Sequence, residues 1–367
     1  MLRPATLSDL DQLVAIENRC FDTDRLSRRS FRRMLSKAKA SMIVDEDIAG
    51  ARLRGYALVL FHAGTPLARL YSFATEPDYR GQGIGMRLLE AAEQAARERD
   101  CVALRLELRR DNEAALRLYE RHGYRQFDIQ EAYYEDHMDA IRMEKSLAPS
   151  LPGDMNVVPY YQQTLEFTCG PAALLMAMHA LDPKLAPNRK LELRIWREAT
   201  TVYMTSGHGG CGPYGLALSA HHRGFGAEVW TNAPDSSLFV DSVRDEGKKE
   251  VIRLVQEDFL DEIQTLRIPV HDGTISLYEL EDAFNAGSIP VVLISSWRIY
   301  QRRAPHWVVI TGFDERFVYV HDPFVDHDEN KARIDSINMP ILKREFAGMA
   351  RYGRNAQRAV VLISPLP

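Results

Sequence analysis

A short segment rich in proline and glycine divides the chain and constrains its fold more than any other feature. Residues 148–154 read Ala-Pro-Ser-Leu-Pro-Gly-Asp, and two prolines with a glycine in so short a stretch favour neither a helix nor a strand. The 367 residues exceed what one hydrophobic core normally needs and suffice for two. We therefore expect two domains, residues 1–147 and 157–367, joined by a linker at residues 148–156.

The composition limits the compartment and the classes of partner. Apolar residues make up 46% of the chain and charged residues 26%, which is ordinary for a folded globular protein. The formal net charge of -5 and the lack of long apolar runs argue against nucleic-acid and membrane partners. The N-terminus shows no secretory pattern, and four scattered cysteines make no disulfide framework. We therefore expect a cytoplasmic protein.

A glycine-rich turn between a strand and a helix is the most informative feature of the first half. Apolar alternation and periodicity predict strands near 42–44, 56–61, 70–75 and 102–108, and helices near 86–98 and 113–121. Within this order, Gly81, Gly83 and Gly85 let the backbone approach a ligand closely. Free amides at the start of the following helix, aided by the helix dipole, favour a pyrophosphate group.

Three kinds of nucleotide site use such a turn, and an ordinary glycine turn is the alternative. A Walker A loop ends in Gly-Lys-Ser/Thr, and a dinucleotide fingerprint is spaced G-x-G-x-x-G, whereas this sequence reads G-x-G-x-G. The third kind is the acetyl-CoA loop of the GNAT acetyltransferases, with the pattern Arg/Gln-x-x-Gly-x-Gly/Ala. Arg80, Gly83 and Gly85 match that pattern.

Residues further along the chain strengthen the third interpretation. The stretch from Asn112 to Tyr124 resembles the Asn-x-x-Ala-x-x-Leu-Tyr-x-x-x-Gly-Phe/Tyr segment of the same family, and Tyr133-Tyr134 resembles its ribosomal-protein alanine N-acetyltransferase branch. This resemblance covers residues 1–147 and implies an α/β GNAT fold, a mixed central sheet flanked by helices. It also implies acetyl-CoA as cofactor and a peptide or protein amine as substrate. The cofactor contacts that it implies are Phe73, Thr75, Arg80, Gly81, Gln82, Gly83, Ile84, Gly85, Met86 and Asn112.

The resemblance also implies which residues carry the chemistry. In this family an amine attacks the acetyl thioester directly, so a base removes a proton from the ammonium and an acid protonates the leaving thiolate. Glu107 matches the base position and Tyr119 the acid position. A solvated carboxylate and a packing tyrosine are the alternatives. Arg25, Arg28 and Arg29 make the expected peptide-reading region basic, so the substrate need not be a ribosomal protein.

A cysteine at the start of an apolar helix is the first informative feature of the second half. The helix predicted for residues 169–181 begins at Cys169, and Pro171 suits its first turn. The helix dipole favours the thiolate form of a thiol placed there. Gln163 and the Cys169 amide can donate to an oxyanion, with Gln162 as the rival side chain. A buried packing cysteine is the alternative.

A histidine and an aspartate supply the rest of a hydrolase constellation. His306 begins one predicted strand and Asp322 follows the next, so adjacent strands place them side by side. Gln163, Cys169, His306 and Asp322 in this order resemble the papain-like C39 cysteine peptidases. The resemblance implies an α+β papain-like fold, with Cys169 as nucleophile, His306 as base, Asp322 as the group that orients it and Gln163 as oxyanion donor.

The C39 resemblance covers residues 157 to about 182 and 288 to about 325, and it leaves a charged helical insert at about 185–285. Many relatives of this type process leader peptides on export machines, and no transporter is attached here, so we do not expect that role. His208 and Cys211 in the insert suggest zinc, but a second pair of ligands is lacking. We expect a substrate-lining glycine loop there and no metal.

Three hypotheses of function follow from these motifs. The first is a bifunctional enzyme, an acetyl-CoA-dependent N-acetyltransferase coupled to a Cys-His-Asp peptidase or amidase. The second keeps the acetyltransferase and makes the second domain a non-catalytic peptide-binding module. The third is a cysteine acyltransferase in peptide metabolite synthesis, with an acyl group carried on Cys169.

Overall fold

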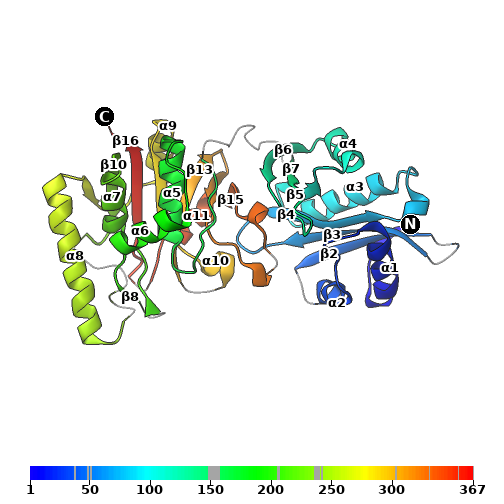
Figure 1. Ribbon diagram of the computed structural model, residues 1–367, viewed down its shortest axis with the longest axis horizontal. Coiled ribbons are helices and arrows are strands. Elements are labelled where there is room, and N and C mark those ends of the chain that lie inside the picture. Colours follow the sequence, from blue (N-terminus) through cyan, green and yellow to red (C-terminus); the bar gives the residue numbers. More distant parts are fainter. Residues whose placement is uncertain are drawn as a thin grey trace. The chain divides into compact units, whose positions relative to one another are not determined.

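Two units make up the chain in the computed structural model, and each is described by itself (Figure 1). The first unit is Met1–Leu151 and the second is Pro152–Pro367. The predicted linker, residues 148–156, lies outside the residues that the structure describes. Those are residues 1–36, 39–47, 49, 52–147, 158–204, 207–234, 240, 243–301, 304–329, 331–353 and 355–366. Within these ranges, no helix is both long and apolar enough to cross a membrane.

The first unit is built on a seven-stranded mixed sheet with the order β1-β2-β3-β4-β5-β7-β6. Its strands are β1 (Leu2–Pro4), β2 (Ala40–Asp47), β3 (Arg52–Phe61), β4 (Leu67–Thr75), β5 (Ala103–Arg109), β6 (Arg125–Gln130) and β7 (Ala140–Ser146). Its helices are α1 (Leu10–Cys20), α2 (Arg28–Ser36), α3 (Ile84–Arg97) and α4 (Glu113–Arg121). Strands β4 and β5 run parallel, and the other neighbouring pairs are antiparallel.

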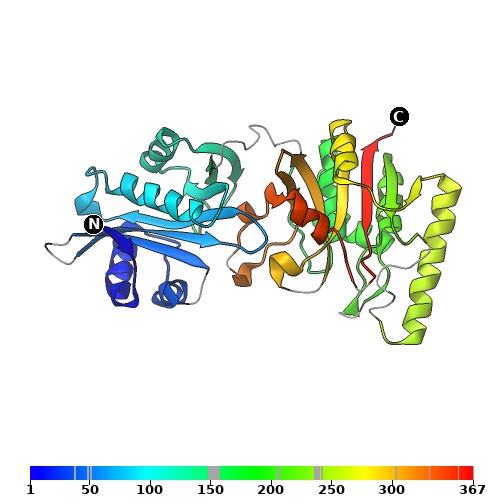
Figure 2. The ribbon, with the colours of Figure 1, turned by 180° about the vertical axis from the view of Figure 1, so that it is seen from behind.

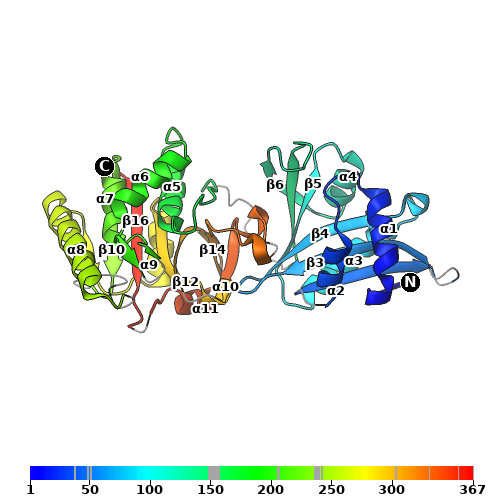
Figure 3. The same ribbon diagram turned by 60° about the horizontal axis from the view of Figure 1, so that its bottom comes forward.

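Helices cover both faces of this sheet, with α1 and α2 on one face and α3 on the other (Figures 1 and 3). Successive side chains of a strand point to opposite faces, so a strand covered twice is apolar throughout. In β3, Tyr56 and Leu58 join the core under α1 and α2, whereas Ala57 and Val59 join the core under α3. The continuous apolar run of β3 therefore reflects burial on both sides.

The sheet opens between β4 and β5. These strands pair only from Leu67–Leu70 with Ala103–Leu106, after which β4 continues along β3 and β5 along β7. The register of β3 and β4 shifts at Leu58 and Val59, which leaves Tyr71 as an extra residue on β4. The opening lies beside the glycine-rich turn that follows β4, so the two features form one region.

The second unit contains another seven-stranded mixed sheet, with the order β11-β10-β16-β12-β13-β14-β15. Its strands are β10 (Phe225–Thr231), β11 (Val270–Asp272), β12 (Ile289–Ser295), β13 (Pro305–Phe313), β14 (Phe317–His321), β15 (Met339–Leu342) and β16 (Ala359–Pro365), and β8 (Tyr203–Met204) with β9 (Gly207–His208) form a separate pair. Its helices are α5 (Cys169–Leu181), α6 (Arg189–Ala199), α7 (Pro213–His221), α8 (Glu246–Leu266), α9 (Leu277–Asn285), α10 (Trp297–Tyr300) and α11 (Lys343–Met349). Within this unit, α5 and α7 lie on one face of the sheet and α9 and α11 on the other (Figures 1 and 2).

Helix α5 is the centre of the second core. Its residues from Gly170 to Met178 are all buried, as expected for a helix that is apolar on every side. A side chain at Gly170 would come within 3.2 Å of both Cys211 Cβ and Trp307 Cδ1. Glycine next to the cysteine therefore lets the start of α5 approach β13 closely.

The main predicted elements are confirmed, with one difference in the second unit. The predicted helices correspond to α3, α4 and α5, and the predicted strands to β2, β3, β4, β5, β13 and β14. The region at 185–285, expected as a helical insert, also supplies β10 and β11 to the main sheet. Strand β10 alternates buried and partly exposed residues, a pattern that the surrounding helical signals concealed.

Candidate active sites

Cys169 is the first residue of α5 and is partly exposed, whereas the helix behind it is buried. As the first helical residue, its N–H has no intrahelical acceptor and remains available as a donor. The N-terminal end of the helix carries partial positive charge, which stabilises a thiolate there. Burial raises the pKa of Cys20, Cys101 and Cys211, so those three thiols are poorer nucleophiles.

His306 and Asp322 lie side by side, from the second residue of β13 and the residue after β14. The His306 Nε2 to Asp322 Oδ1 distance is 2.6 Å, and both side chains are almost fully buried. The antiparallel pairing of β13 with β14, which sets Val309 opposite His321, brings the two positions together. Asp322 holds Nε2, so Nδ1 is the ring nitrogen left for Cys169, which also hydrogen-bonds this ring.

Charge favours an ion pair between these two residues. Burial lowers the pKa of His306, but the Asp322 carboxylate and the hydrogen bond with Cys169 raise it, to about 10. Burial raises the pKa of Asp322, but the His306 and Lys331 charges and the Tyr300 hydroxyl hold it below its usual value. At neutral pH the imidazole is therefore protonated beside a carboxylate, the arrangement that maintains a thiolate partner.

Tyr300 is a member of the site that the motifs did not identify. Its hydroxyl lies 2.5 Å from Asp322 Oδ2 and 3.1 Å from the Phe324 carbonyl, and its ring packs edge-on against His306. The Lys331 ammonium lies 4.3 Å from the ring centre of Tyr300. Burial and Asp322 raise the pKa of Tyr300, so it remains a hydrogen-bond donor. It comes from the short helix α10, for which the sequence shows no motif.

Backbone and side-chain hydrogen bonds hold Gln163 next to the segment that carries Asp322. Its N–H donates to the Pro323 carbonyl at 2.9 Å, and the Tyr160 hydroxyl donates to the Asp322 carbonyl at 2.9 Å. The Gln163 Nε2 donates one hydrogen to the Leu165 carbonyl at 2.7 Å, which leaves its second hydrogen free. The amide therefore retains one donor for an oxyanion, the role predicted for it.

Glu192 anchors the loop that carries Gln163 to Cys169, and sequence reasoning missed it. This fully buried carboxylate of α6 accepts hydrogen bonds from the Thr164 N–H and hydroxyl, the Thr168 hydroxyl and the Tyr161 hydroxyl. A buried carboxylate with this many donors fixes the loop in one conformation. The available signal was the spacing of apolar residues in α6, which puts Glu192 on its buried face.

The glycine cluster of the second unit packs against the start of α5. The Trp307 Nε1 donates to the Cys211 carbonyl at 3.0 Å, and the His208 ring packs at a tilt against the Phe167 ring, with ring centres 4.6 Å apart. Cys211 is buried, whereas His208 is exposed and engaged by aromatic rings. These residues form part of the wall beside Cys169, and among the described residues no metal-binding cluster is found.

In the first unit, the glycine turn has the geometry that a bound pyrophosphate requires. Gly81 and Gly83 have φ of +77° and +72°, a backbone conformation that L side chains rarely adopt. Gly83 is the N-cap of α3, and a side chain at either glycine would point into open space. The turn therefore presents the first amides of a helix of 14 residues to solvent, which suits the pyrophosphate of CoA.

The other predicted cofactor residues fall into two groups. Phe73 and Thr75, at the end of β4, face Gly85 on α3, since a Cβ there would lie 3.7 and 3.6 Å from them. Arg80 and Gln82 in the turn and Met86 on α3 are exposed, and Arg80 Nε donates to the Thr75 carbonyl at 3.3 Å. The second group, Ile84 and Asn112, contributes to the structure of the unit itself. Ile84 is buried in the core under α3, and Asn112 caps α4 by accepting from the Ala115 N–H at 3.1 Å.

Tyr119 and Glu107 occupy buried positions at this opening. The Tyr119 ring packs between Phe73 and Tyr124, and burial raises the pKa of its hydroxyl, which keeps the proton that an acid must supply. Glu107, on β5, is 5% exposed. Its carboxylate accepts hydrogen bonds from the Arg69 guanidinium, from Arg142 Nε at 3.2 Å and from the Tyr133 hydroxyl at 3.1 Å. The role of base for Glu107 stays a prediction.

Comparisons with known proteins match two different families, one in each unit of the chain. The model of the Peptidase_C39 like family matches residues 158–364, and that of the Acetyltransferase (GNAT) family matches residues 10–124. A Bacillus subtilis (strain 168) relative of the ribosomal protein bS18-alanine N-acetyltransferase type is 29% identical over 135 residues, which are 37% of this chain and 87% of the relative. The Salmonella typhimurium (strain LT2) ribosomal protein bS18-alanine N-acetyltransferase is 39% identical over 79 residues, 21% of this chain and 53% of that enzyme.

Among solved structures, the Escherichia coli ribosomal-protein-S18-alanine N-acetyltransferase is 25% identical to this chain. The match covers 42% of this chain and 97% of that one, with a TM-score of 0.37. The family matches and the sheet topology together give the N-terminal unit a GNAT-like α/β fold with a mixed sheet, and the C-terminal unit a second mixed sheet with helices in the C39-like region.

Proposed function

This chain belongs to the Peptidase_C39 like family and carries a GNAT acetyltransferase domain ahead of it, and from this premise we propose a bifunctional enzyme. The C-terminal unit hydrolyses an amide bond in a peptide through Cys169, His306 and Asp322. The N-terminal unit transfers an acetyl group from acetyl-CoA to a peptide or protein α-amine.

The contact of His306 with both Asp322 and Cys169 carries the first half of the proposal. The Cys169 thiolate attacks the amide carbon, and the oxyanion that forms accepts hydrogen bonds from the Cys169 N–H and the Gln163 amide. Protonated His306 gives its proton to the leaving amine as the carbon–nitrogen bond breaks. Water, deprotonated by the now neutral His306, then attacks the thioester, releases the carboxylic acid and restores the thiolate.

The glycine turn and the opening between β4 and β5 support the second half. The turn and the first amides of α3 would hold the pyrophosphate of acetyl-CoA, whose thioester supplies the acetyl group. The opening beside Phe73 and Thr75 would receive the rest of the cofactor. Tyr119 lies buried at this opening and retains its proton, as an acid for the departing thiolate must. Glu107 remains the proposed base.

The two reactions fit one another chemically. Hydrolysis of a peptide bond frees an α-amine, and ribosomal protein bS18-alanine N-acetyltransferases, which the N-terminal unit resembles, are named for acetylating an alanine. A peptide fragment released by Cys169 would thus belong to the acceptor class of the N-terminal unit. The basic side chains of Arg25, Arg28 and Arg29 favour an acidic peptide near that acceptor.

Alkylation of the cysteines tests the peptidase site without a known substrate. Native protein is treated with limiting iodoacetamide from pH 5 to 9, and each cysteine is measured by peptide mass spectrometry. We expect Cys169 to be labelled selectively at pH 6, because a thiolate paired with His306 reacts where ordinary thiols are protonated. The three cysteines whose pKa burial raises are internal controls.

The variant His306→Ala should remove this selectivity, while Gln301→Ala, on the turn after α10, should preserve it. Equal labelling of Cys169 and Cys20 in the unmodified protein would reject the peptidase and leave a peptide-binding module beside the acetyltransferase. The acetyltransferase is tested separately by acetyl transfer to peptides with a free N-terminus in the Cys169→Ala variant.

A further inference from the structure

A cavity of about 360 Å³ lies on the second unit away from the catalytic cysteine. Its floor is a row of three residues that face each other across neighbouring strands, since Trp230 pairs with Val360 and Val360 with Val292. The neighbours Val229, Val361 and Val291 point to the other face and join the core under α5. The floor therefore lies on the sheet face opposite α5, and Gln163, Cys169, His306 and Asp322 take no part in lining it.

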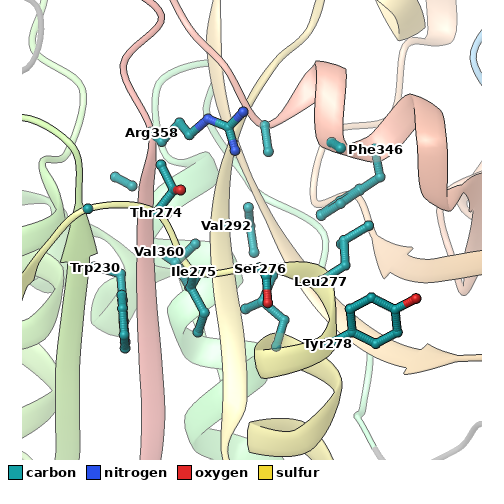
Figure 4. Close-up of a pocket in the computed structure, with 15 residues that line it drawn as sticks. Trp230, Thr274, Ile275, Ser276, Leu277, Tyr278, Val292, Phe346, Arg358 and Val360 are labelled. Carbon is teal, nitrogen blue, oxygen red and sulfur yellow. The ribbon is translucent and has the colours of Figure 1, made fainter.

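The walls of this cavity are apolar. Leu277 and Leu280 come from α9, Phe346 and Ala347 from α11, and Ile275 from the loop before α9. Figure 4 shows Phe346 and Leu277 on one side of the cavity and Trp230 on the other. A cavity of this size and lining suits a single large apolar side chain, whose burial supplies most of the binding free energy.

The polar groups around the cavity favour a negative charge. Among the described residues that line it, none is acidic, whereas Arg358 extends over the strand that carries Val292 (Figure 4). The Arg358 guanidinium has no ion pair with any described residue. Burial and the neighbouring Arg351 charge lower the pKa of Arg358, so an anion beside this guanidinium would relieve both effects.

One further feature adds to this preference. The indole nitrogen of Trp230, a residue that lines the cavity, is buried without a hydrogen-bond partner among the described residues, which is costly unless a ligand or solvent supplies an acceptor. The N-terminus of α9 also borders the cavity, but the Glu279 carboxylate already accepts a hydrogen bond from the Ser276 N–H there. The Trp230 donor calls for an acceptor, and the Arg358 cation favours one that carries negative charge.

We propose that this cavity binds an apolar residue that bears a free carboxylate, the group with which a peptide chain ends. The side chain would fill the space between α9 and α11, and the carboxylate would pair with Arg358. The site is separate from Cys169, so it does not depend on the reactivity of that cysteine. A site for the carboxyl end would let this unit hold peptides by a feature that an amidated or internal segment lacks.

The test compares N-acetyl-L-phenylalanine with its neutral carboxamide, by calorimetric titration of the full chain with Cys169→Ala. The acetylated amine prevents use of the probe as an acceptor by the N-terminal unit. We expect the acid to bind with a dissociation constant on the order of 1 mM, as ligand efficiency implies for its size, and the amide at least about tenfold more weakly. Equal binding of acid and amide would overturn the proposal.

Two arginine variants locate the binding. Arg358→Gln should weaken binding of the acid about tenfold, whereas Arg351→Gln, which removes an exposed charge outside the cavity, should change it less than about twofold. Unchanged binding in Arg358→Gln, with a normal melting temperature, would also overturn the proposal.

The source of the carboxylate follows from a second probe. Gly-Gly-Gly-Phe has the same terminal residue on a short chain. If it binds clearly more tightly than N-acetyl-L-phenylalanine, the ligand is a peptide end. If the two bind equally, the cavity recognises a small apolar acid. Both results support a carboxylate site, and failure of both acids to bind would reject it.

Discussion

Glu107 in the first unit and Asp322 in the second are both buried carboxylates with basic neighbours, but they are held differently. Glu107 lies between the guanidiniums of Arg69 and Arg142, which stay charged at every accessible pH. Asp322 accepts from one imidazole, which can lose its proton and also contacts a thiol. The number of hydrogen bonds is similar, so the difference lies in whether the donor can give up its charge.

The two sites therefore differ in their cations: the arginines around Glu107 keep their charge, whereas the His306 imidazole can lose its charge. Two buried guanidiniums share Glu107, and Arg142 also pairs with Asp128 at 2.6 Å, so this carboxylate belongs to a network of permanent charges. A proton leaving His306 goes to a substrate, while Asp322 remains an acceptor for the neutral ring. A base at Glu107 would therefore act beside two permanent cations, whereas the base of the second unit exchanges its own proton with the substrate.

The largest expected effect comes from the nucleophile. Cys169→Ala should reduce peptide hydrolysis by about 10⁴-fold or more, since no other group can form the thioester, and should leave acetyl transfer unchanged. The matched control is Cys211→Ala, which removes a buried thiol on the wall beside Cys169. Activity is measured on a peptide library by mass spectrometry. Loss of acetyl transfer along with hydrolysis would show that the two activities are not separate.

The next effect concerns Asp322, the carboxylate that pairs with the ionisable His306. Asp322→Asn should lower kcat/KM for hydrolysis by about 10²- to 10⁴-fold, because the amide cannot stabilise the imidazolium. The pKa of His306, about 10 in the folded protein, should fall, so activity should be lost at lower pH than in the unmodified enzyme. A pH profile of kcat/KM checks both. An unchanged alkaline limb would mean that Asp322 does not set the charge of His306.

The same pair makes a prediction about stability. The pKa of His306 is raised above its unfolded value near 6.5, so its contribution is complete below about pH 6.5 and is lost as pH rises through about 10. The pKa of Asp322 is lowered, so its contribution is present at neutral pH and is lost as pH falls below the ordinary carboxyl range. Denaturant unfolding of Asp322→Asn should therefore show a weaker pH dependence than that of the unmodified protein.

Glu107, the carboxylate between two arginines, should contribute to the stability of the folded protein. Glu107→Gln should destabilise the protein by about 1–3 kcal/mol, because it removes the carboxylate that Arg69 and Arg142 share, while Arg142 keeps its ion pair with Asp128. The control is Glu144→Gln, since Glu144 pairs with Arg105 but is 22% exposed, and its loss should cost less. Thermal unfolding measures both. An unaltered melting temperature with a large fall in kcat for acetyl transfer would instead establish Glu107 as the base.

The smallest expected effect is that of Tyr300. Tyr300→Phe removes one hydrogen bond to Asp322 and should cost about tenfold in kcat/KM, with little change in KM. Tyr278→Phe, at an exposed hydroxyl in the same unit, is the control. If Tyr300→Phe behaves like the control, the hydroxyl does not position Asp322, and the carboxylate is held by its hydrogen bonds with His306 and the Phe324 N–H.

Local patterns predicted much of each site because the chemistry begins at the ends of regular elements. Gly83 at the start of α3 and Cys169 at the start of α5 are visible from glycine spacing and from an apolar helix after a cysteine. Helix ends are determined by neighbouring residues, so a short window suffices. No short stretch of sequence identifies Tyr300, because it belongs to a helix of four residues that has no periodic pattern.

The sequence by itself predicted two domains and determined the family motifs and the order Gln163, Cys169, His306, Asp322. Only the tertiary structure decided that Glu107 forms ion pairs with two arginines, that Glu192 anchors the loop before Cys169 and that β10 joins the main sheet. The physical reason is distance along the chain. A motif records what neighbouring residues do to the backbone, whereas buried ion pairs and strand neighbours join segments whose separation carries no local signal.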